Sequence, residues 1–427
     1  MKFIYADALD YVDPDFDFAS DRTHEDRDIQ WDDQYPHEFL ERAPYDGILV
    51  SRGVVGDIHG HGKYTHAQMM RFRREGARRF MRYAEKDYPG SLIFGDCGAF
   101  TYRNEKVPPY TPEDTVDFYA DGGFSHGCSV DHLIFDFDEG QGRTREQVPD
   151  DTRDRFDITL QLAAEFKRES KRLGKGFTPM GVVQGWSAPS MADSARQLVK
   201  MGFDYLAIGG MVPLDVIQIH RAVRAIRAAI PPKVRLHLLG FGKIENIGEF
   251  TDYGVASFDT TSPLLRAFKD ARKNYFARTD EGELSYYTAI RVPQSRDNNK
   301  LKAKAKRGVL RQEDALRLES AALDGLRGYA EGRLPVEVAL DATLNYWAAL
   351  NWRESDSEAT KLRALKKQRE IYHRTLSDMP WKNCRCRVCR EGGVEALIFR
   401  TSNRNKRRGI HNLHIFYQHL LSHRLVA

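Results

Sequence analysis

The sequence predicts an α/β fold, a TIM (β/α)8 barrel, with a helical insert and a C-terminal zinc-binding subdomain. Short apolar runs alternate with amphipathic helical patterns, polar residues follow the runs, and three cysteines cluster near the end of the chain. Alternating strands and helices form a parallel sheet, and eight such strands suit a closed barrel. A doubly wound open sheet remains the alternative, because the first apolar run is weak.

The apolar runs that we interpret as strands lie in the first 260 residues. They cover residues 3–5, 48–50, 92–94, 133–137, 180–183, 205–208, 236–239 and 255–258. Helical patterns, with apolar residues three to four apart, lie between them, including a long one at 65–85. His59, His61 and His66 fall in a Gly-rich stretch that we interpret as a loop near the barrel rim rather than as a second metal site.

Polar or glycine residues follow these runs directly. The loops after the strands of a barrel share one rim, where active sites form. Each such residue alone is more often a turn or a helix cap, but the repetition along the chain favours a common site. Two of them, Asp96 and Asp259, suit glycosidic chemistry, in which one carboxylate attacks the anomeric carbon and the other moves a proton. The full set is Asp96, Asp136, Asp138, Gln184, Gly209, Gly210, Gly240, Gly242 and Asp259.

We divide the chain into three domains. Residues 1–292 form the barrel, with a separate N-terminal segment at 1–45, and residues 293–378 form a basic helical insert. Residues 379–427 form the zinc-binding subdomain, whose C-terminal helix we expect to pack on the barrel.

Composition supports a globular protein, since 41% of residues are hydrophobic and 30% are charged. No long apolar run or export signal occurs, so we expect a cytoplasmic location and no membrane partner.

Charge is unevenly distributed, although the net charge is only +4. Residues 296–311 carry seven basic side chains against one Asp, and residues 400–408 carry five with no acid. Segregated positive charge suits a phosphate-binding face, whereas the plainer interpretation of a charge run is solvated surface. Our candidates for nucleic-acid contact are Lys302, Lys304, Lys306, Arg307, Arg404 and Arg407.

The cysteines indicate a structural zinc site. Cys384, Cys386 and Cys389 form a CxCxxC motif, and His411 follows on a segment with helical apolar spacing. Three thiolates and one imidazole make a closed tetrahedral set that leaves no position for a catalytic water. His414 is the competing fourth ligand, and a redox or inert cysteine cluster is the alternative to zinc.

Seven motifs occur here in the order seen in the tRNA-guanine transglycosylase family, which the chain resembles over roughly 90–275 and 380–424. They are GDCGAF, FDFDEG, GVVQG, YLAIGGM, LLGFG, GVASFD and CxCxxC followed by IHNL. The opening MKFIYADALDYVDPDFDF and the later APYDGILVSRGVV resemble the DNA-modifying branch, the DpdA-type DNA-guanine transglycosylases of bacteria and their phages.

The resemblance implies a pentosyltransferase that exchanges guanine in DNA for a 7-deazaguanine base, typically 7-cyano-7-deazaguanine (preQ0). A covalent aspartyl glycosyl-enzyme is its intermediate, and zinc is its structural metal. Guanine inside a duplex cannot meet a buried nucleophile, so base flipping or local melting is implied. DNA and the free base are the expected partners, and the mechanism also admits a DNA-opening protein or ATPase and a homodimer.

The resemblance also assigns roles to residues at matching positions. Asp259 matches the nucleophile, and Asp96 matches the residue that protonates the leaving purine and deprotonates the incoming one. Base-binding positions are Phe100, Asp138, Gln184, Gly209, Gly210, Met211 and Leu239. Phe100 would stack on the base, Leu239 would pack on its other face, and Gln184 and Gly210 would read its edge. Asp138 follows from the FDE match, with Asp136 as the alternative.

Two departures from the family bear on the substrate. Cys97, Gly98 and Ala99 stand where Ser-Gly-Gly is usual, and TTSPLLRAF replaces the arginine-rich stretch after the nucleophile of bacterial tRNA enzymes. The second change disfavours the runner-up, the same exchange on tRNA. A non-catalytic nucleic-acid-binding subunit is a third hypothesis, which retention of both aspartates disfavours. A metabolic barrel enzyme would leave the basic segments unexplained.

Overall fold

The computed structural model describes residues 1–40, 42–57, 62–138 and 143–425. The chain forms two compact units, each built from two stretches of sequence. The first comprises Met1–Leu9 and Tyr45–Ser262, and the second comprises Asp10–Pro44 and Pro263–Ala427. The expected insert and zinc-binding subdomain thus fall in one unit, and the three-domain division stays a prediction.

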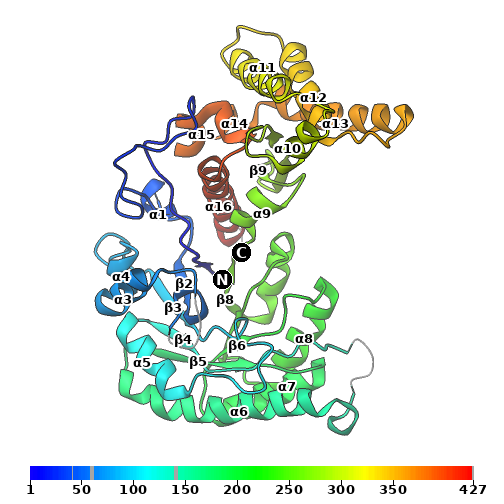
Figure 1. The fold of residues 1–427 in the computed structure, drawn as a ribbon. Coiled ribbons are helices and arrows are strands. Elements are labelled where there is room, and N and C mark those ends of the chain that lie inside the picture. The colour runs from blue at the N-terminus through cyan, green and yellow to red at the C-terminus, as the bar shows by residue number, and fades with distance from the viewer. Residues whose placement is uncertain (41, 58–61, 139–142, 426–427) are drawn as a thin grey trace. The chain divides into compact units, whose positions relative to one another are not determined.

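Eight parallel strands close into a barrel in the first unit (Figure 1), which confirms the TIM barrel and excludes the open sheet. Seven of the eight coincide with predicted apolar runs. Their bounds are β1 Lys2–Ala6, β2 Gly47–Ser51, β3 Leu92–Asp96, β4 His126–Cys128, β5 Thr178–Val183, β6 Tyr205–Ile208, β7 Arg235–Leu238 and β8 Val255–Thr260.

The fourth strand differs from the sequence prediction. It is the short β4 at His126–Cys128, whereas residues 133–137 lie outside any strand. The sequence HGC carries no apolar run, and the apolar run that follows belongs to the loop after the strand. Asp136 and Asp138 therefore stand well beyond the end of β4, and Asp131 is the first carboxylate after it.

Helices of the barrel unit begin where the sequence supplies a capping side chain. Thr111, Ser187 and Asp215 each accept a hydrogen bond from the backbone N–H three residues on, at the starts of α5, α7 and α8. The pattern at 65–85 forms two helices, α3 and α4, because Gly76 lies between them with φ of +77°. His66 begins α3, and His59 and His61 lie outside the described residues.

The helices of this unit have the following bounds: α2 Arg52–Val55, α3 His66–Glu75, α4 Ala77–Phe80, α5 Pro112–Gly122, α6 Asp150–Glu169, α7 Ala188–Lys200 and α8 Val216–Ala229. Three 3-10 helices accompany them: η1 Arg145–Gln147, η2 Ser170–Leu173 and η3 Ile244–Tyr253.

The interior of the barrel is a packed core. Strands β1 to β6 each contribute one or two side chains that fill it. This core contains Ile4, Leu49, Phe94, Cys128, Met180, Val182, Tyr205 and Ala207.

The second unit is mainly helical, as expected for the insert and the C-terminal segment. It also holds an antiparallel hairpin, β9 Tyr275–Arg278 with β10 Leu284–Tyr287, and a short parallel pair, β11 Ile290–Arg291 with β12 Ile398–Phe399. Its helices are α1 Pro36–Phe39, α9 Ser262–Lys269, α10 Asn299–Lys306, α11 Gln312–Ala330, α12 Val336–Asn351, α13 Glu358–Asp378, α14 Pro380–Asn383, α15 Arg387–Gly392, η4 Gly393–Leu397 and α16 Ser402–Leu425. A continuous apolar core joins these elements.

Among the described residues, no helix is both long enough and apolar enough to cross a membrane.

Candidate functional site

The barrel brings together two carboxylates that are far apart in the sequence. Asp96 is the last residue of β3, and Asp259 is the penultimate residue of β8. Strand β8 pairs with β1, where Ile4 lies opposite Asp259, and β2 pairs with β3, where Ser51 lies opposite Asp96. Both carboxylates therefore lie at the carboxyl ends of the strands, where loops of a barrel build sites.

The environment of Asp96 favours its protonated form. Burial raises its pKa above the usual value, a hydrogen bond with Ser51 opposes the rise, and the charge of Asp259 adds to it. The backbone N–H of Gly98 also donates to Asp96 Oδ2 over 3.2 Å. A raised pKa makes a carboxyl group better able to hold a proton and to deliver it to a substrate than an ordinary aspartate is.

A buried chain of hydrogen bonds holds Asp259. Its Oδ1 accepts from the backbone N–H of Gly240 over 2.9 Å and lies 3.1 Å from Nε2 of His237. On the other side of the ring, His237 Nδ1 lies 2.6 Å from the Ser257 hydroxyl, which lies 2.5 Å from the hydroxyl of Tyr205. Since these contacts use Oδ1, the second oxygen of Asp259 is the one left to act on a substrate.

Gln184 and the two glycines after β6 lie together. A Cβ at Gly209 would meet Gln184 Nε2 at 2.3 Å, and a Cβ at Gly210 would meet Gln184 Oε1 at 3.2 Å. The Gln184 amide is fixed on both sides, because Nε2 donates to Asp131 Oδ2 over 2.7 Å and Oε1 accepts from the Ile134 N–H over 3.3 Å. The absence of a side chain at Gly209 and Gly210 lets their backbone approach the Gln184 amide closely.

Asp131 is a buried carboxyl group that the sequence did not single out. Its Oδ1 accepts a hydrogen bond from the Cys97 thiol over 3.1 Å, and the Tyr102 hydroxyl donates to its backbone carbonyl over 3.0 Å. Burial raises the pKa of Asp131 to about 7, hydrogen bonds from Cys97 and Gln184 oppose the rise, and the charge of Asp96 adds to it. Asp131 thus connects the Cys97 loop to Gln184.

Two exposed aromatic rings lie on the loops after β3 and β4. Phe100 is 49% exposed and Phe135 is 40% exposed, and their ring centroids are 5.8 Å apart. Large apolar side chains this exposed suit a ligand with a flat face. Of the other two apolar candidates, Met211 is buried, and Leu239 is partly buried against the barrel core.

Asp136 and Asp138 both contact the same arginine, Arg143. Arg143 Nη2 lies 2.8 Å from Asp136 Oδ2, and the Arg143 backbone N–H donates to Asp138 Oδ2 over 2.9 Å. Asp138 is the less exposed of the two side chains, at 25% against 53%. The role of Asp138 stays a prediction, while Asp131 is the carboxylate in contact with Gln184.

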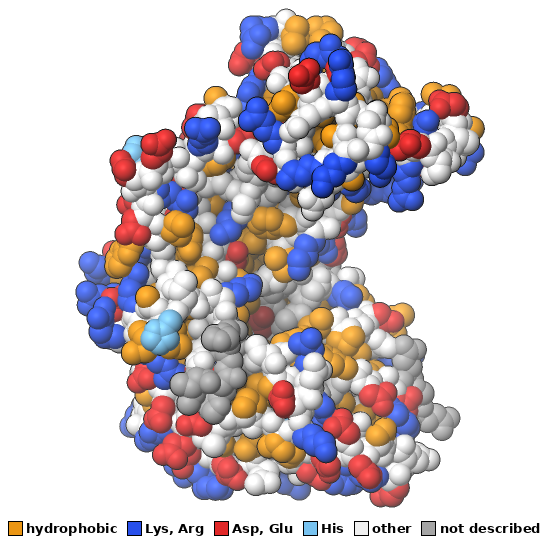
Figure 2. All heavy atoms as spheres, in the orientation of Figure 1, with side chains coloured by type: hydrophobic (Ala, Val, Ile, Leu, Met, Phe, Trp, Pro, Cys, Tyr) orange, Lys and Arg blue, Asp and Glu red, His pale blue; other side chains and the backbone are white. Residues whose placement is uncertain are grey.

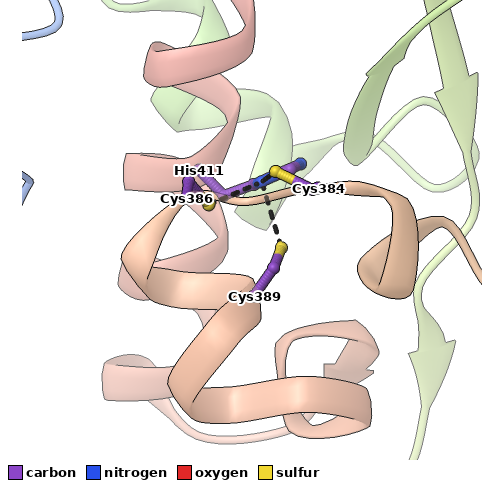
Figure 3. Close-up of side chains that lie close together, drawn as sticks. All are labelled: Cys384, Cys386, Cys389 and His411. Atoms are coloured by element: carbon purple, nitrogen blue, oxygen red, sulfur yellow. Dashed lines mark hydrogen bonds between the residues drawn. The ribbon is translucent and has the colours of Figure 1, made fainter.

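Three thiols and one imidazole converge in the second unit (Figure 3). Nδ1 of His411 lies 3.6, 3.4 and 3.3 Å from Sγ of Cys384, Cys386 and Cys389, and all four atoms lie within 4.8 Å of one another. His411 Nε2 lies 2.8 Å from the Phe276 carbonyl, so Nε2 carries the proton and Nδ1 faces the sulfurs. This donor set fits a tetrahedral zinc ion, and it contains His411 rather than His414.

The surroundings of this cluster also suit a bound ion. The ring of Tyr275 stacks on His411 with centroids 4.1 Å apart, and its hydroxyl lies 3.0 Å from Cys389 Sγ. The cysteines lie on and before α15, and His411 lies on α16 (Figure 3). A bound zinc would therefore tie α16 to the segment that precedes it, as a scaffold rather than as a reagent.

Two arginines that we expected to contact nucleic acid, Arg404 and Arg407, are buried. Arg404 is fully buried on α16, where it pairs with Asp21 and Glu395, so neither DNA nor solvent reaches it. Arg407 is 3% exposed and donates to the backbone carbonyls of Asp13 and Pro14. A charge run on a helix suggested a basic surface, but these guanidinium groups bind the N-terminal segment of their own unit.

The basic residues around α10 present charge outward, except for one. Lys302, Lys306 and Arg307 are exposed, whereas Lys304 is half-buried and donates to the Ala349 carbonyl. Arg307 also lies 3.3 Å from Glu354. On the face drawn in Figure 2, Lys and Arg side chains gather over the helices α10 to α13.

Several residues of the barrel site escaped the sequence reasoning. His237, Ser257 and Tyr205 lie within strands, and Asp131 lies just after one, in positions that look like ordinary core. The available signal was the period of two, which turns His237 to the same side as Leu239, a residue that packs against the barrel core. Phe135 belongs to an apolar run that predicts a strand, whereas in the structure it lies outside any strand with its ring exposed.

Comparison with known proteins gives two kinds of match. The family model described as queuine tRNA-ribosyltransferase matches residues 133–293. A DNA-guanine transglycosylase from Salmonella montevideo is 40% identical over 421 residues, which cover 98% of this chain and 96% of that protein. A queuine tRNA-ribosyltransferase from Shewanella sp. (strain W3-18-1) is 30% identical over 151 residues, which cover 35% of this chain and 38% of that protein.

We expect Asp131→Asn to change how stability depends on pH. Because the folded pKa of about 7 lies above the value of 3.8 for an ordinary Asp, folding favours the neutral acid. Its stabilising effect is present below pH 4 and is lost as pH rises to 7, by up to about 4 kcal/mol. The variant should therefore gain thermal stability relative to the wild type as pH rises from about 4 to about 7. An unchanged difference between the two proteins across this range would contradict the assignment.

We expect Cys389→Ser to abolish tight binding of the zinc ion that this donor set fits. Zinc that survives exhaustive dialysis should fall below one ion per chain by elemental analysis, and residues 263–427 should become sensitive to limited proteolysis, because such sites contribute ~10 kcal/mol or more to folding. Cys128→Ala, at a buried cysteine of the barrel, is the matched control and should keep its zinc. Full zinc retention by Cys389→Ser would refute the ligand assignment.

Proposed function

The chain belongs to the guanine transglycosylase family, on the branch of DNA-guanine transglycosylases, and we propose from this premise that it exchanges guanine in DNA for a 7-deazaguanine base, with preQ0 as the expected one. It is a glycosyltransferase-type enzyme. The observation that carries the proposal is the pair of carboxylates at one end of the barrel, Asp96 with a raised pKa and Asp259 held by two donors.

Asp259 is the nucleophile of the proposed reaction. Its Oδ2 attacks C1′ of the target deoxyguanosine, and the bond between C1′ and N9 breaks with its electron pair going to the guanine. The product is a glycosyl ester on Asp259. His237 and the Gly240 N–H keep Oδ1 in place throughout, so the attacking oxygen needs no rearrangement.

Asp96 handles the proton in both halves of the exchange. As a neutral acid it protonates the departing guanine, and as the resulting carboxylate it removes the N9 proton of the incoming 7-deazaguanine. The freed electron pair of N9 then attacks C1′ and displaces Asp259. The exchange thus returns the proton to Asp96 and frees Asp259 from the sugar, which restores the enzyme.

The base is held by groups that lie around these carboxylates. The amide of Gln184, fixed by Asp131, and the backbone of Gly210 read its polar edge, and Phe100 stacks on its face. Met211, Leu239 and Asp138 complete the proposed pocket. Since Asp259 is buried, a guanine in duplex DNA must leave the stack to reach it, at a cost of a few kcal/mol. A DNA-opening partner would lower that cost.

The proposal is tested by following base exchange on DNA and on tRNA in parallel. Incorporation of preQ0 into DNA is read by nucleoside mass spectrometry, and Asp259→Asn should abolish it. Asp193→Asn, on the exposed part of α7, is the matched control and should retain full activity. Incorporation into tRNA alone would move the activity to that substrate, and activity on neither nucleic acid would contradict the proposal.

His237 acts as a positioning residue for Asp259, so His237→Phe should slow exchange without weakening DNA binding. Loss of both ring nitrogens frees the nucleophile to turn, and displacement of a reacting group by about 1 Å costs roughly 10²-fold in rate. We expect kcat to fall by that amount with KM for DNA unchanged. His237→Gln, whose Nε2 can still donate to Asp259, should restore part of the rate. A loss of DNA binding equal to the loss of rate would indicate a purely structural role.

The exposed lysines of α10 are the proposed phosphate contacts. Lys302→Glu combined with Lys306→Glu should weaken binding to DNA of any sequence, and the slope of log Kd against log salt should fall by about 0.9 for each phosphate that the protein no longer neutralises. Lys171→Glu with Lys175→Glu makes the same change of net charge on the barrel unit and serves as control. Equal weakening in the two double variants would point to net charge rather than to α10.

A further inference from the structure

A second group of metal-ligating side chains lies at the far end of α16. His419 and His423 are four residues apart, so they share one face of the helix. Glu283 lies in the turn between β9 and β10, directly before β10 begins. One ligand atom from each of the three residues lies within 4.8 Å of the other two. This group is separate from Cys384, Cys386, Cys389 and His411, from which His419 is distant by two turns of helix, ~12 Å.

Hydrogen bonds fix the protonation pattern of both imidazoles. His419 Nδ1 lies 3.2 Å from the Gly282 carbonyl oxygen, and His423 Nδ1 lies 2.9 Å from the His419 carbonyl oxygen. Since a carbonyl only accepts, each Nδ1 must carry the hydrogen, and the neutral ring then has its lone pair on Nε2. A ring N–H anchored on a carbonyl is the arrangement that orients histidine for a metal.

The Nε2 atom of His423 faces the Glu283 carboxylate. His423 Nε2 lies 3.7 Å from Glu283 Oε1, too far for a hydrogen bond. His419 is 6% exposed, and burial lowers its pKa, a shift that the Gly282 carbonyl opposes. Two imidazoles, each anchored on a carbonyl through Nδ1, and one carboxylate thus offer ligand atoms within 4.8 Å of one another, as a bound cation requires.

We propose that Glu283, His419 and His423 bind a zinc ion, in a second site with an exchangeable fourth position. Two imidazole nitrogens and one carboxylate oxygen are a donor set suited to zinc, and water would complete the tetrahedron. Ligand atoms around zinc lie ~3.4 Å apart, so the group must contract slightly. Glu283 and His423 are 64% and 46% exposed, and their mobile side chains allow that movement.

The ion would fasten the end of α16 to the β9–β10 hairpin. His411 and Asn412 already join α16 to β9 through the backbone of Phe276. At the hairpin turn, Arg278 Nη2 donates to the Ser422 hydroxyl over 2.6 Å. Zinc on Glu283, His419 and His423 would join the same two elements a second time. It would bind more weakly than the Cys3His ion, because the site has three protein ligands and two of them are exposed.

The full-length protein is dialysed to equilibrium against buffered free zinc, and bound metal is counted by elemental analysis. We expect the wild type to hold one ion at low free zinc and a second ion as free zinc rises. Glu283→Gln and His423→Gln should each keep the first ion and lose the second. The retained ion shows that the variant is folded, which separates loss of the site from loss of structure.

His373→Gln on α13 is the matched control, because His373 pairs with Glu337 at 3.8 Å in a group of only two such ligands among the described residues. It should bind the second ion as the wild type does. Added zinc should also raise the unfolding temperature of the wild type and of His373→Gln, and not that of His423→Gln, since a ligand that binds only the folded state stabilises it. A wild type that never exceeds one ion, or a His423→Gln variant that still binds two, would overturn the proposal.

Discussion

Closure of the barrel between β1 and β8 is the constraint on which the proposed catalytic arrangement depends. Asp259 lies opposite Ile4 of β1, whose other neighbour β2 places Ser51 opposite Asp96. Without that closure, the first and last strands would lie at opposite edges of a sheet, and the two carboxylates would lie far apart. The same closure buries Asp259 and raises the pKa of Asp96, so the geometry and the proton affinities have one origin.

Inside this frame, polar residues of the barrel interior prepare both sides of the site. Tyr205, Ser257 and His237 form a buried line that ends on Asp259, and Asp131 holds Gln184 from the opposite direction. Buried polar groups are costly unless they are paired, and here each is paired with a neighbour in the network. These hydrogen bonds fix the orientations of the Asp259 carboxylate and the Gln184 amide, which the proposed reaction requires.

Much of the fold followed from the sequence, and the failures have physical causes. Apolar runs located most strands because parallel strands are buried on both faces, whereas His126–Cys128 is too short and too polar to give that signal. The rim positions of Asp96, Gln184 and Asp259 followed from the strands. The hydrogen bonds of His237 and the burial of Arg404 did not, because both depend on residues remote in sequence, Asp259 and Asp21.

The N-terminal segment Asp10–Pro44 leaves the barrel unit after β1 and belongs to the other one. Its Asp21 carboxylate accepts a hydrogen bond from Arg404, 383 residues later in the chain. During synthesis, β8 emerges from the ribosome well before α16 does, so the barrel can close while this segment still lacks its partners. Such a contact closes a very long loop, and its high contact order places it late in folding. The second unit is therefore assembled only after α16 has been made, from one segment that lies between β1 and β2 and another that follows β8.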